Sequence, residues 1–116
     1  MKKYINLILL CTLLLLFSCK ENADLTMEQG IHFYKTEKYS DAMQAFNDVI
    51  YELEQLDYID EIDRKLLARA YYNLGLTYSK VGDFNKAEYN LNAAIQLNPL
   101  EEFFIALSLI QENSIK

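Results

Sequence analysis

The side chains that could carry out chemistry are an acidic run, a single histidine and two cysteines. The acidic run could bind calcium, but it lacks the order of an EF-hand loop, in which acids at positions one, three and five precede a glycine at six. Its members are Glu52, Glu54, Asp57, Asp60, Glu61 and Asp63. His32 alone offers too few ligands for zinc and too few partners for a Ser-His-Asp arrangement. We therefore predict no metal, no cofactor and no catalytic residue, with the acids at a solvated turn and His32 on an exposed helix face.

One cysteine, Cys19, ends an apolar N-terminal segment, "MKKYINLILLCTLLLLFSC". Two lysines precede an apolar run that is too short to span a bilayer comfortably, which is typical of a secretory signal peptide. The ending "LFSC" resembles the lipobox of bacterial lipoproteins, where the cysteine is acylated and becomes the new N-terminus. The resemblance implies a signal peptide over residues 1–18, lipidation at Cys19 and a lipidated tether over residues 19–25. An incidental cysteine after an ordinary signal peptide, and an uncleaved anchor helix, remain as alternatives.

The residues after Cys19 bear on location. Lys20 follows the cysteine where an aspartate would favour the inner membrane, so resemblance to enterobacterial lipoprotein sorting implies the outer membrane. The stretch "CKEN" also partly resembles a surface-export signal of other Gram-negative lineages. We therefore expect a lipid-anchored protein of the cell envelope, on the periplasmic side or the surface of the outer membrane.

Length and charge limit what the rest of the chain can be. At 116 residues it holds one domain at most, and 17 acids against 11 bases give a net charge of −6. This charge argues against nucleic acid as a partner, because phosphate contacts need clustered lysine and arginine.

Ten glycine, alanine, proline, leucine and aromatic residues between positions 68 and 101 define a pattern of intervals: Tyr71, Leu74, Gly75, Tyr78, Gly82, Phe84, Ala87, Leu91, Ala94 and Pro99. This spacing resembles that of the tetratricopeptide repeat, a 34-residue helix–turn–helix unit. The residue type at three of these positions has a physical reason: Gly75 lets two helices approach closely, Gly82 permits the tight turn, and Pro99 ends the second helix. Asn85 and Glu88 fit a capping box for that second helix.

An earlier, degenerate copy lies at residues 23–56. It keeps the same mutual spacing at Gly30, Phe33, Tyr39, Ala42 and Phe46, while Glu37 stands at the turn glycine and Glu54 at the terminal proline. Gly30 precedes Gly75 by more than one repeat length, so we predict that the helices between them are lengthened, with a turn near Asp57–Asp60.

Apolar residues at helical spacing continue along both lengthened helices. The predicted core face of the first helix comprises Ala42, Phe46, Val49, Leu53 and Leu56, and that of the second comprises Ile62, Leu66, Ala70, Leu74 and Tyr78.

Residues 100–113 predict a closing helix that seals the second repeat. Its inward stripe is expected to be Leu100, Phe103, Phe104, Leu107 and Ile110. Ile105 and Leu109 point away from this stripe, and pairing them across a two-fold axis would bury them in a homodimer. The fold class is thus all-α: a short helix–turn–helix solenoid of about two repeats over residues 26–116, with five helices antiparallel to their neighbours, the last of which is the capping helix.

In this family the concave face is lined mainly by the first helix of each unit. The resemblance places Met27, Ile31, Tyr34, Lys35, Tyr72, Asn73, Leu76, Ser79 and Lys80 there. Chaperone-binding members use a clamp rich in lysine and asparagine for a C-terminal carboxylate; Asn73 fits one clamp position, but Met27 and Ile31 occupy others. An extended or helical segment with apolar anchors suits this face better.

We predict a non-enzymatic lipoprotein that serves as an adaptor or assembly factor for another envelope protein. The alternative is a self-associating structural lipoprotein without a groove ligand.

Overall fold

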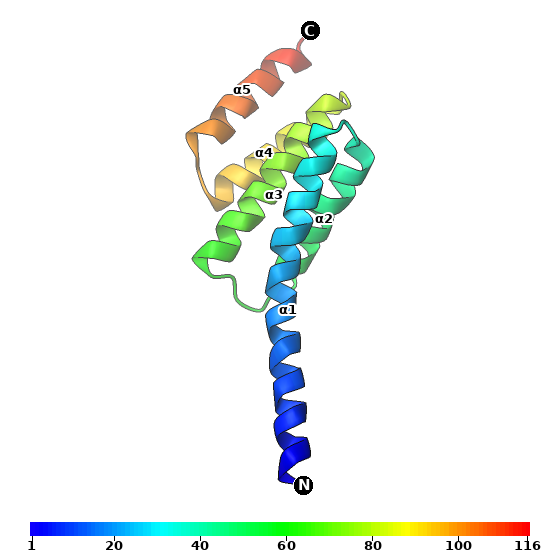
Figure 1. Ribbon diagram of the computed structural model, residues 1–116. Coiled ribbons are helices and arrows are strands. Elements are labelled where there is room, and N and C mark those ends of the chain that lie inside the picture. The colour runs from blue at the N-terminus through cyan, green and yellow to red at the C-terminus, as the bar shows by residue number, and fades with distance from the viewer.

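The computed structural model describes the backbone of residues 1–116 and the side chains of residues 1–14 and 22–116. Every element in the described backbone is an α-helix: α1 (Lys2–Lys35), α2 (Tyr39–Glu54), α3 (Glu61–Lys80), α4 (Phe84–Leu97) and α5 (Glu101–Ser114). Each helix packs mainly on the next one along the chain, and the helices alternate in direction (Figure 1). The predicted all-α stack of helical hairpins is confirmed.

The first helix, α1, runs without a break from the predicted signal peptide into the first repeat. Its N-terminal section projects from the helical body and gives the molecule dimensions of 71 × 27 × 18 Å (Figure 1). Among the described residues, none of the helices combines the length and the hydropathy that crossing a membrane requires. Ala23, within the predicted tether, is 3% exposed and belongs to the core formed by α1, α2 and α3. The boundaries at residues 18 and 25 stay predictions.

The turns of the two helical hairpins have the same hydrogen bonds. The amide of Lys38 donates to the Phe33 carbonyl (2.8 Å), and the amide of Asp83 donates to the Tyr78 carbonyl (2.9 Å). Each turn also has one residue in the left-handed region, Gly82 at φ 84° and, in the first copy, a glutamate at φ 61°. The first copy is therefore a structural repeat of the second despite its weaker sequence.

Helix packing within the two hairpins also matches. A Cβ atom on Gly30 would lie 2.6 Å from Cε1 of Phe46, and one on Gly75 would lie 3.0 Å from Cγ of Leu91. A methyl group on Gly30 would overlap the Phe46 ring, and one on Gly75 would force Leu91 to shift by a few tenths of an ångström. The two glycines thus let α1 approach α2, and α3 approach α4, as the sequence predicts.

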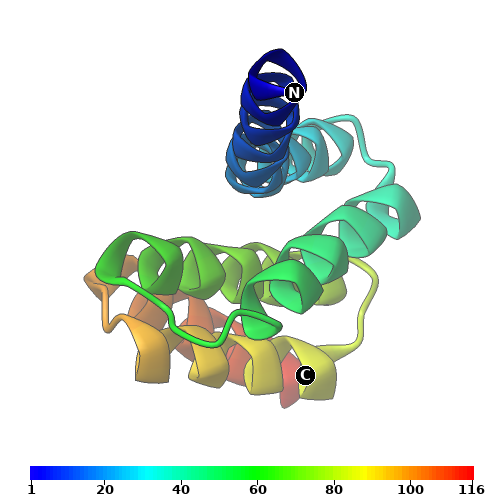
Figure 2. The ribbon, with the colours of Figure 1, turned by 90° about the horizontal axis from the view of Figure 1, so that it is seen from below.

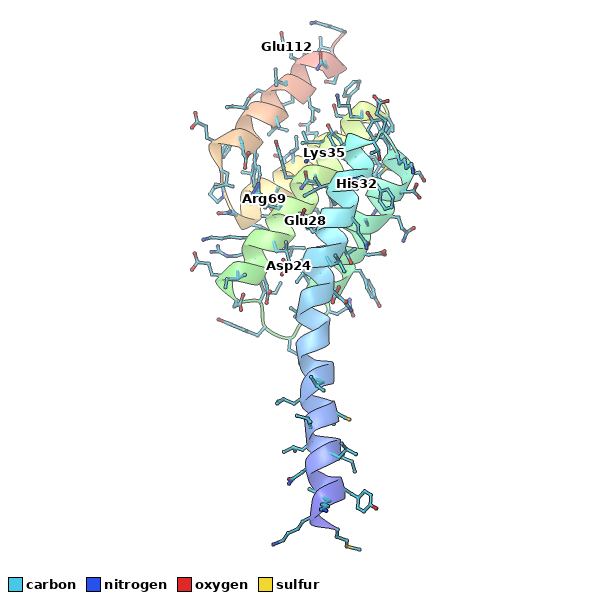
Figure 3. The ribbon with its side chains drawn as sticks, viewed as in Figure 1. Asp24, Glu28, His32, Lys35, Arg69 and Glu112 are labelled. Carbon is cyan, nitrogen blue, oxygen red and sulfur yellow. The ribbon has the colours of Figure 1, made fainter. Side chains whose placement is uncertain are left out.

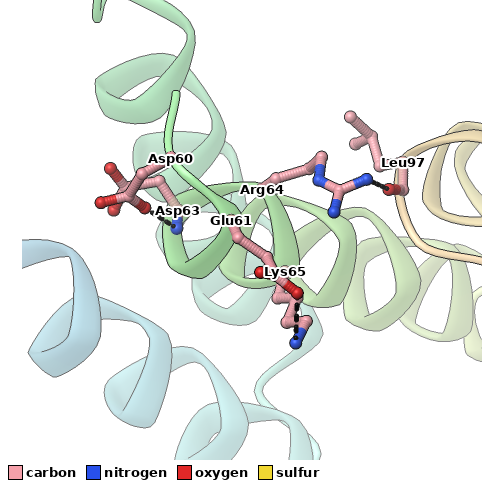
Figure 4. A network of polar contacts seen from close by, with 6 residues as sticks. All are labelled: Asp60, Glu61, Asp63, Arg64, Lys65 and Leu97. Carbon is pink, nitrogen blue, oxygen red and sulfur yellow. Dashed lines mark hydrogen bonds and ion pairs between the residues drawn. The ribbon is translucent and has the colours of Figure 1, made fainter. Parts of the chain in front are cut away.

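The loop between α2 and α3, over residues 55–60, confirms the predicted turn and ends in a helix cap (Figure 4). The Asp60 carboxylate accepts a hydrogen bond of 2.8 Å from the Asp63 amide, which satisfies one free donor at the start of α3. One turn along α3, Arg64 donates to the Leu97 carbonyl at the end of α4 (3.3 Å). The first turn of α3 is thus joined to the end of α4, its partner in the second hairpin.

The predicted capping box at Asn85 and Glu88 is wrong. Helix α4 begins at Phe84, so Asp83 is its N-cap and accepts a hydrogen bond of 3.2 Å from the Lys86 amide. Glu88 instead accepts a hydrogen bond from the Gln111 side chain of α5 (3.0 Å). The N-cap lies two residues before the predicted one, and Lys86 stands at the position where a capping box needs glutamate or glutamine.

Three predicted core residues are exposed. Leu56 is 45% exposed because α2 ends at Glu54. Ile62 is 69% exposed, because residues four apart drift by about 40° around a helix and two such steps carry it out of the face that holds Ala70. Phe104 is 48% exposed, since the buried face of α5 is centred on Phe103, Ala106 and Ile110.

Candidate functional site

The candidate site is the face shared by α1, α3 and α5, the first helices of successive units. Besides their contacts with α2 and α4, α1 touches α3 and α3 touches α5. Figure 2 shows α2 bridging α1 and α3 on one side, while no described helix covers these two on the opposite side. We call this uncovered surface the groove face and define it by the residues that follow.

The predicted groove residues of α1 and α3 are mostly half-buried, and their assignment to this face stays a prediction. Ile31 and Tyr34 of α1 are half-buried, as are Tyr72, Asn73, Leu76 and Ser79 of α3, whereas Lys35 and Lys80 are exposed. Met27 is the exception: it is 4% exposed and packs in the core with Ala23 and Phe46. It shares with Ala23 and Gly30 the side of α1 that meets α2, so it is a core residue rather than a groove residue.

Tyr72 lies where the three helices meet. Its ring stacks on Phe103 of α5, with centroids 4.6 Å apart and planes at 28°. Burial raises the pKa of the Tyr72 phenol, and the charges of Glu102 on α5 and Tyr34 on α1 raise it further, against an opposing effect of Arg69. The phenol is protonated at neutral pH, as in an ordinary tyrosine, so it can donate a hydrogen bond.

Charged side chains border the groove face. Arg69 and Glu102 form a loose ion pair at 4.0 Å between α3 and α5. Along α1, Asp24, Glu28 and His32 follow one another at intervals of four residues, all exposed, and Lys35 follows in the last turn (Figure 3). The helix thus changes from acidic to basic toward its C-terminus.

Sequence analysis did not assign two parts of this charged border to the site. Asp24 and Glu28 were not assigned to the site, although their four-residue spacing on a predicted helix was visible. Arg69 was missed as well, because its partner Glu102 lies on another helix and no spacing rule connects the two. His32 is exposed, as predicted.

A second apolar surface lies on α5. Ile105 and Leu109 are each 54% exposed, which confirms that they point away from the buried stripe. They lie 34 residues, one repeat length, after Tyr71 and Gly75 of α3. Gly75 is where α4 packs on α3, so Ile105 and Leu109 occupy the side of α5 that would receive the second helix of a further unit. Pairing of two copies through this side stays a prediction.

The acidic run serves local structure. Glu61 pairs with Lys65 at 3.0 Å, and the hydrogen bond from Lys65 lowers the pKa of this carboxyl. Glu54 accepts a hydrogen bond from the Tyr71 hydroxyl and so ties α2 to α3. Among the residues that the structure describes, no three histidine, cysteine or acidic side chains gather as metal ligands would.

The predicted lipidation site, Cys19, lies outside the residues whose side chains are described. Its acylation stays a prediction from the sequence.

Comparison with known proteins supports the module that the geometry suggests. No curated protein matches the chain. Residues 68–99, which span α4 and most of α3, match the family model described as "Tetratricopeptide repeat". This unit in general mediates protein–protein interaction. The segment that contains Tyr72 is therefore a tetratricopeptide repeat.

Proposed function

We propose that this protein is a non-catalytic adaptor or assembly factor of the bacterial cell envelope, which binds a segment of another envelope protein on its groove face. The observation that carries the proposal is the position of Tyr72, a half-buried aromatic residue at the junction of three helices within a tetratricopeptide repeat. Buried aromatic residues with one polar atom are frequent anchors of protein interfaces.

The chemistry of the face favours a segment with apolar anchors. Ile31, Tyr34 and Leu76 are half-buried and apolar or aromatic, and the two lysines assigned to this face, Lys35 and Lys80, lie in the last turns of α1 and α3. A clamp for a terminal carboxylate is disfavoured, because Met27 is buried and Ile31 offers no hydrogen-bond donor. An amphipathic helix or an extended strand with apolar side chains at regular intervals would fit.

We further propose that acylation of Cys19 holds the protein at the outer membrane, on its periplasmic side or its surface. The support is the sequence pattern: two lysines, an apolar run and a cysteine at its end. Two or three acyl chains bury enough methylene groups for stable attachment, whereas one chain alone would be marginal.

A matched pair of variants tests the groove. Tyr72→Ala with Leu76→Ala should weaken binding of a partner, captured by photo-crosslinking at residue 31 and then purified, by about 30-fold or more if both are anchors. Tyr89→Ala with Asp57→Asn is the control: it removes a tyrosine side chain from α4, where Tyr89 is exposed, together with a charge in the α2–α3 loop. Circular dichroism must show that both variants remain folded. Equal loss in both, or loss in the control alone, would move the binding site off the groove face.

The exposed Ile105 and Leu109 favour a second candidate, a structural lipoprotein that self-associates through α5 and has no groove ligand. In that case the Tyr72 and Leu76 variant would leave every captured partner bound.

A further inference from the structure

Exposed apolar side chains gather at one end of the helical body. They are Leu25 at 58%, Leu56 at 45%, Tyr58 at 80% and Ile62 at 69% exposure, and we call them the proximal apolar set. They belong to α1 just after the start of its packed part, to the α2–α3 loop and to the first turn of α3. In Figure 1 this loop lies at the end from which the N-terminal section of α1 emerges, opposite the C-terminus. Isolated exposed apolar residues are ordinary, but several at the end nearest a membrane attachment are not.

The chain between the proposed attachment and the body is short. Three residues separate Cys19 from Ala23, which is already in the core. Fully extended, the four steps between them reach about 14 Å, and as a helix they rise only about 6 Å. An acylated Cys19, or an N-terminal helix lying in the membrane, would therefore keep this end of the body next to the lipid headgroups.

We propose that the α2–α3 loop docks on the lipid surface through the proximal apolar set, with Tyr58 and Ile62 at the depth of the headgroups. The proposal rests on the proposed membrane attachment. A tyrosine suits this depth because its ring is apolar and its hydroxyl remains hydrated. Leu25 and Leu56 would add apolar area beside it.

Neighbouring charges limit the depth and select the lipid. Asp57 is exposed in the same loop, Asp60 caps α3, and Glu61 is paired with the exposed Lys65. Carboxylates do not enter the hydrocarbon region and are repelled by an anionic surface. A zwitterionic surface should therefore be preferred to an anionic one. Docking at this end would turn the α3–α4 turn and the C-terminus away from the membrane (Figure 1).

The absence of tryptophan from the chain allows a direct test. In the Tyr58→Trp variant of the full chain, purified from membranes and reconstituted into phosphatidylcholine vesicles, the emission should shift to shorter wavelength and be quenched by brominated lipid. Tyr89→Trp is the matched control, because Tyr89 is similarly exposed, at 72%, but lies on α4. Its emission should resemble that in water. Adding phosphatidylglycerol should reduce the shift of the Tyr58→Trp variant.

Separate labelling with a palmitate analogue distinguishes this proposal from the attachment itself. An acylated, vesicle-bound protein whose Tyr58→Trp emission matches that of the Tyr89→Trp control would overturn the docking and leave the attachment standing. A chain that takes up no label and does not sediment with vesicles would overturn both. An unlabelled chain whose Tyr58→Trp emission still shifts would support the docking and show that acylation is not its cause.

Discussion

Glu37 and Gly82 occupy equivalent turns, with φ values of 61° and 84°, yet only one of them is a residue that adopts this conformation without strain. The left-handed region costs a residue with a Cβ atom roughly 1–2 kcal/mol, and glycine avoids this cost. The substitution of glutamate for the turn glycine, visible in the sequence, is therefore a local loss of stability that the packing of the first hairpin offsets.

We expect Glu37→Gly to stabilise the protein by roughly 1 kcal/mol and Gly82→Ala to destabilise it by a similar amount. Urea unfolding followed by circular dichroism measures both. Lys38→Gly is the control: Lys38 has φ −87°, so glycine there should only lower stability. If Glu37→Gly also lowers stability, the glutamate side chain has a role that its backbone angle does not reveal.

Tyr71 gives a prediction about alkaline pH. Burial raises the pKa of its phenol, and the hydrogen bond it donates to Glu54 raises it further, so the folded-state pKa lies above the unfolded value of about 10. Below pH 10 both states hold the proton and this stabilisation is complete. Above it the unfolded state loses its proton first, so the free energy of unfolding falls as pH rises.

Tyr71→Phe should therefore reduce the fall in unfolding free energy between about pH 9 and 11, although the variant loses a hydrogen bond at neutral pH. Tyr58→Phe, at an 80% exposed position, is the control, and its free energy of unfolding should fall with pH as that of the parent does. Parallel curves for the parent and Tyr71→Phe would contradict the expectation.

At the scale of elements, the helices and their turns could be predicted because glycine, proline and apolar spacing act locally. The end of α4 follows from Pro99, since the residue before a proline avoids helical geometry, and Asn98 is extended with ψ 93°. Burial was less predictable. Ile62 was assigned to the core by continuing a four-residue spacing beyond the buried part of α3. Met27 was assigned to the groove from its position in the family's repeat, but which side of α1 meets α2 depends on the packing of whole helices.

Close packing of α1 on α2 predicts a coupled pair. Gly30→Ala should destabilise the protein by about 1–3 kcal/mol, because its methyl group would overlap the Phe46 ring. Phe46→Leu removes that ring edge, so the double variant should lose less stability than the sum of the two single variants. Gly75→Ala combined with Phe46→Leu should be additive, because Gly75 faces Leu91 instead. Additive free energies for the Gly30 pair would show that the hairpin relaxes around the methyl group.

At the scale of the whole molecule, α5 ends the stack with an open side. Only the protein-binding class of the candidate site could be predicted, since a repeat sequence specifies its scaffold and leaves the choice of ligand to surface residues. The ion pair of Arg69 with Glu102 and the stacking of Tyr72 on Phe103 connect separate helices, so they appear only once the fold brings those helices together.

Self-association through α5 can be tested by charge. Ile105→Glu with Leu109→Lys should shift the full chain from dimer to monomer in sedimentation equilibrium while the helical signal stays unchanged. Residues 101–114 include Glu101, Glu102 and Glu112 but no basic residue, so two antiparallel α5 helices would repel each other. Added salt should therefore strengthen the dimer. Tyr89→Glu on α4 is the control. A parent chain that is monomeric at tens of micromolar would contradict this expectation.

The packing of each helix on its chain neighbours also determines how the protein can be assembled in time. Among the described residues, α1 and α2 do not pack directly on α4 or α5. Of the described helices that follow the first hairpin, only α3 contacts it. Such local contacts close only short loops, which favours fast folding. A chain that emerges N-terminus first, from a ribosome or a translocation channel, could complete each hairpin as it appears, and the last helix could open and reclose without disturbing the first.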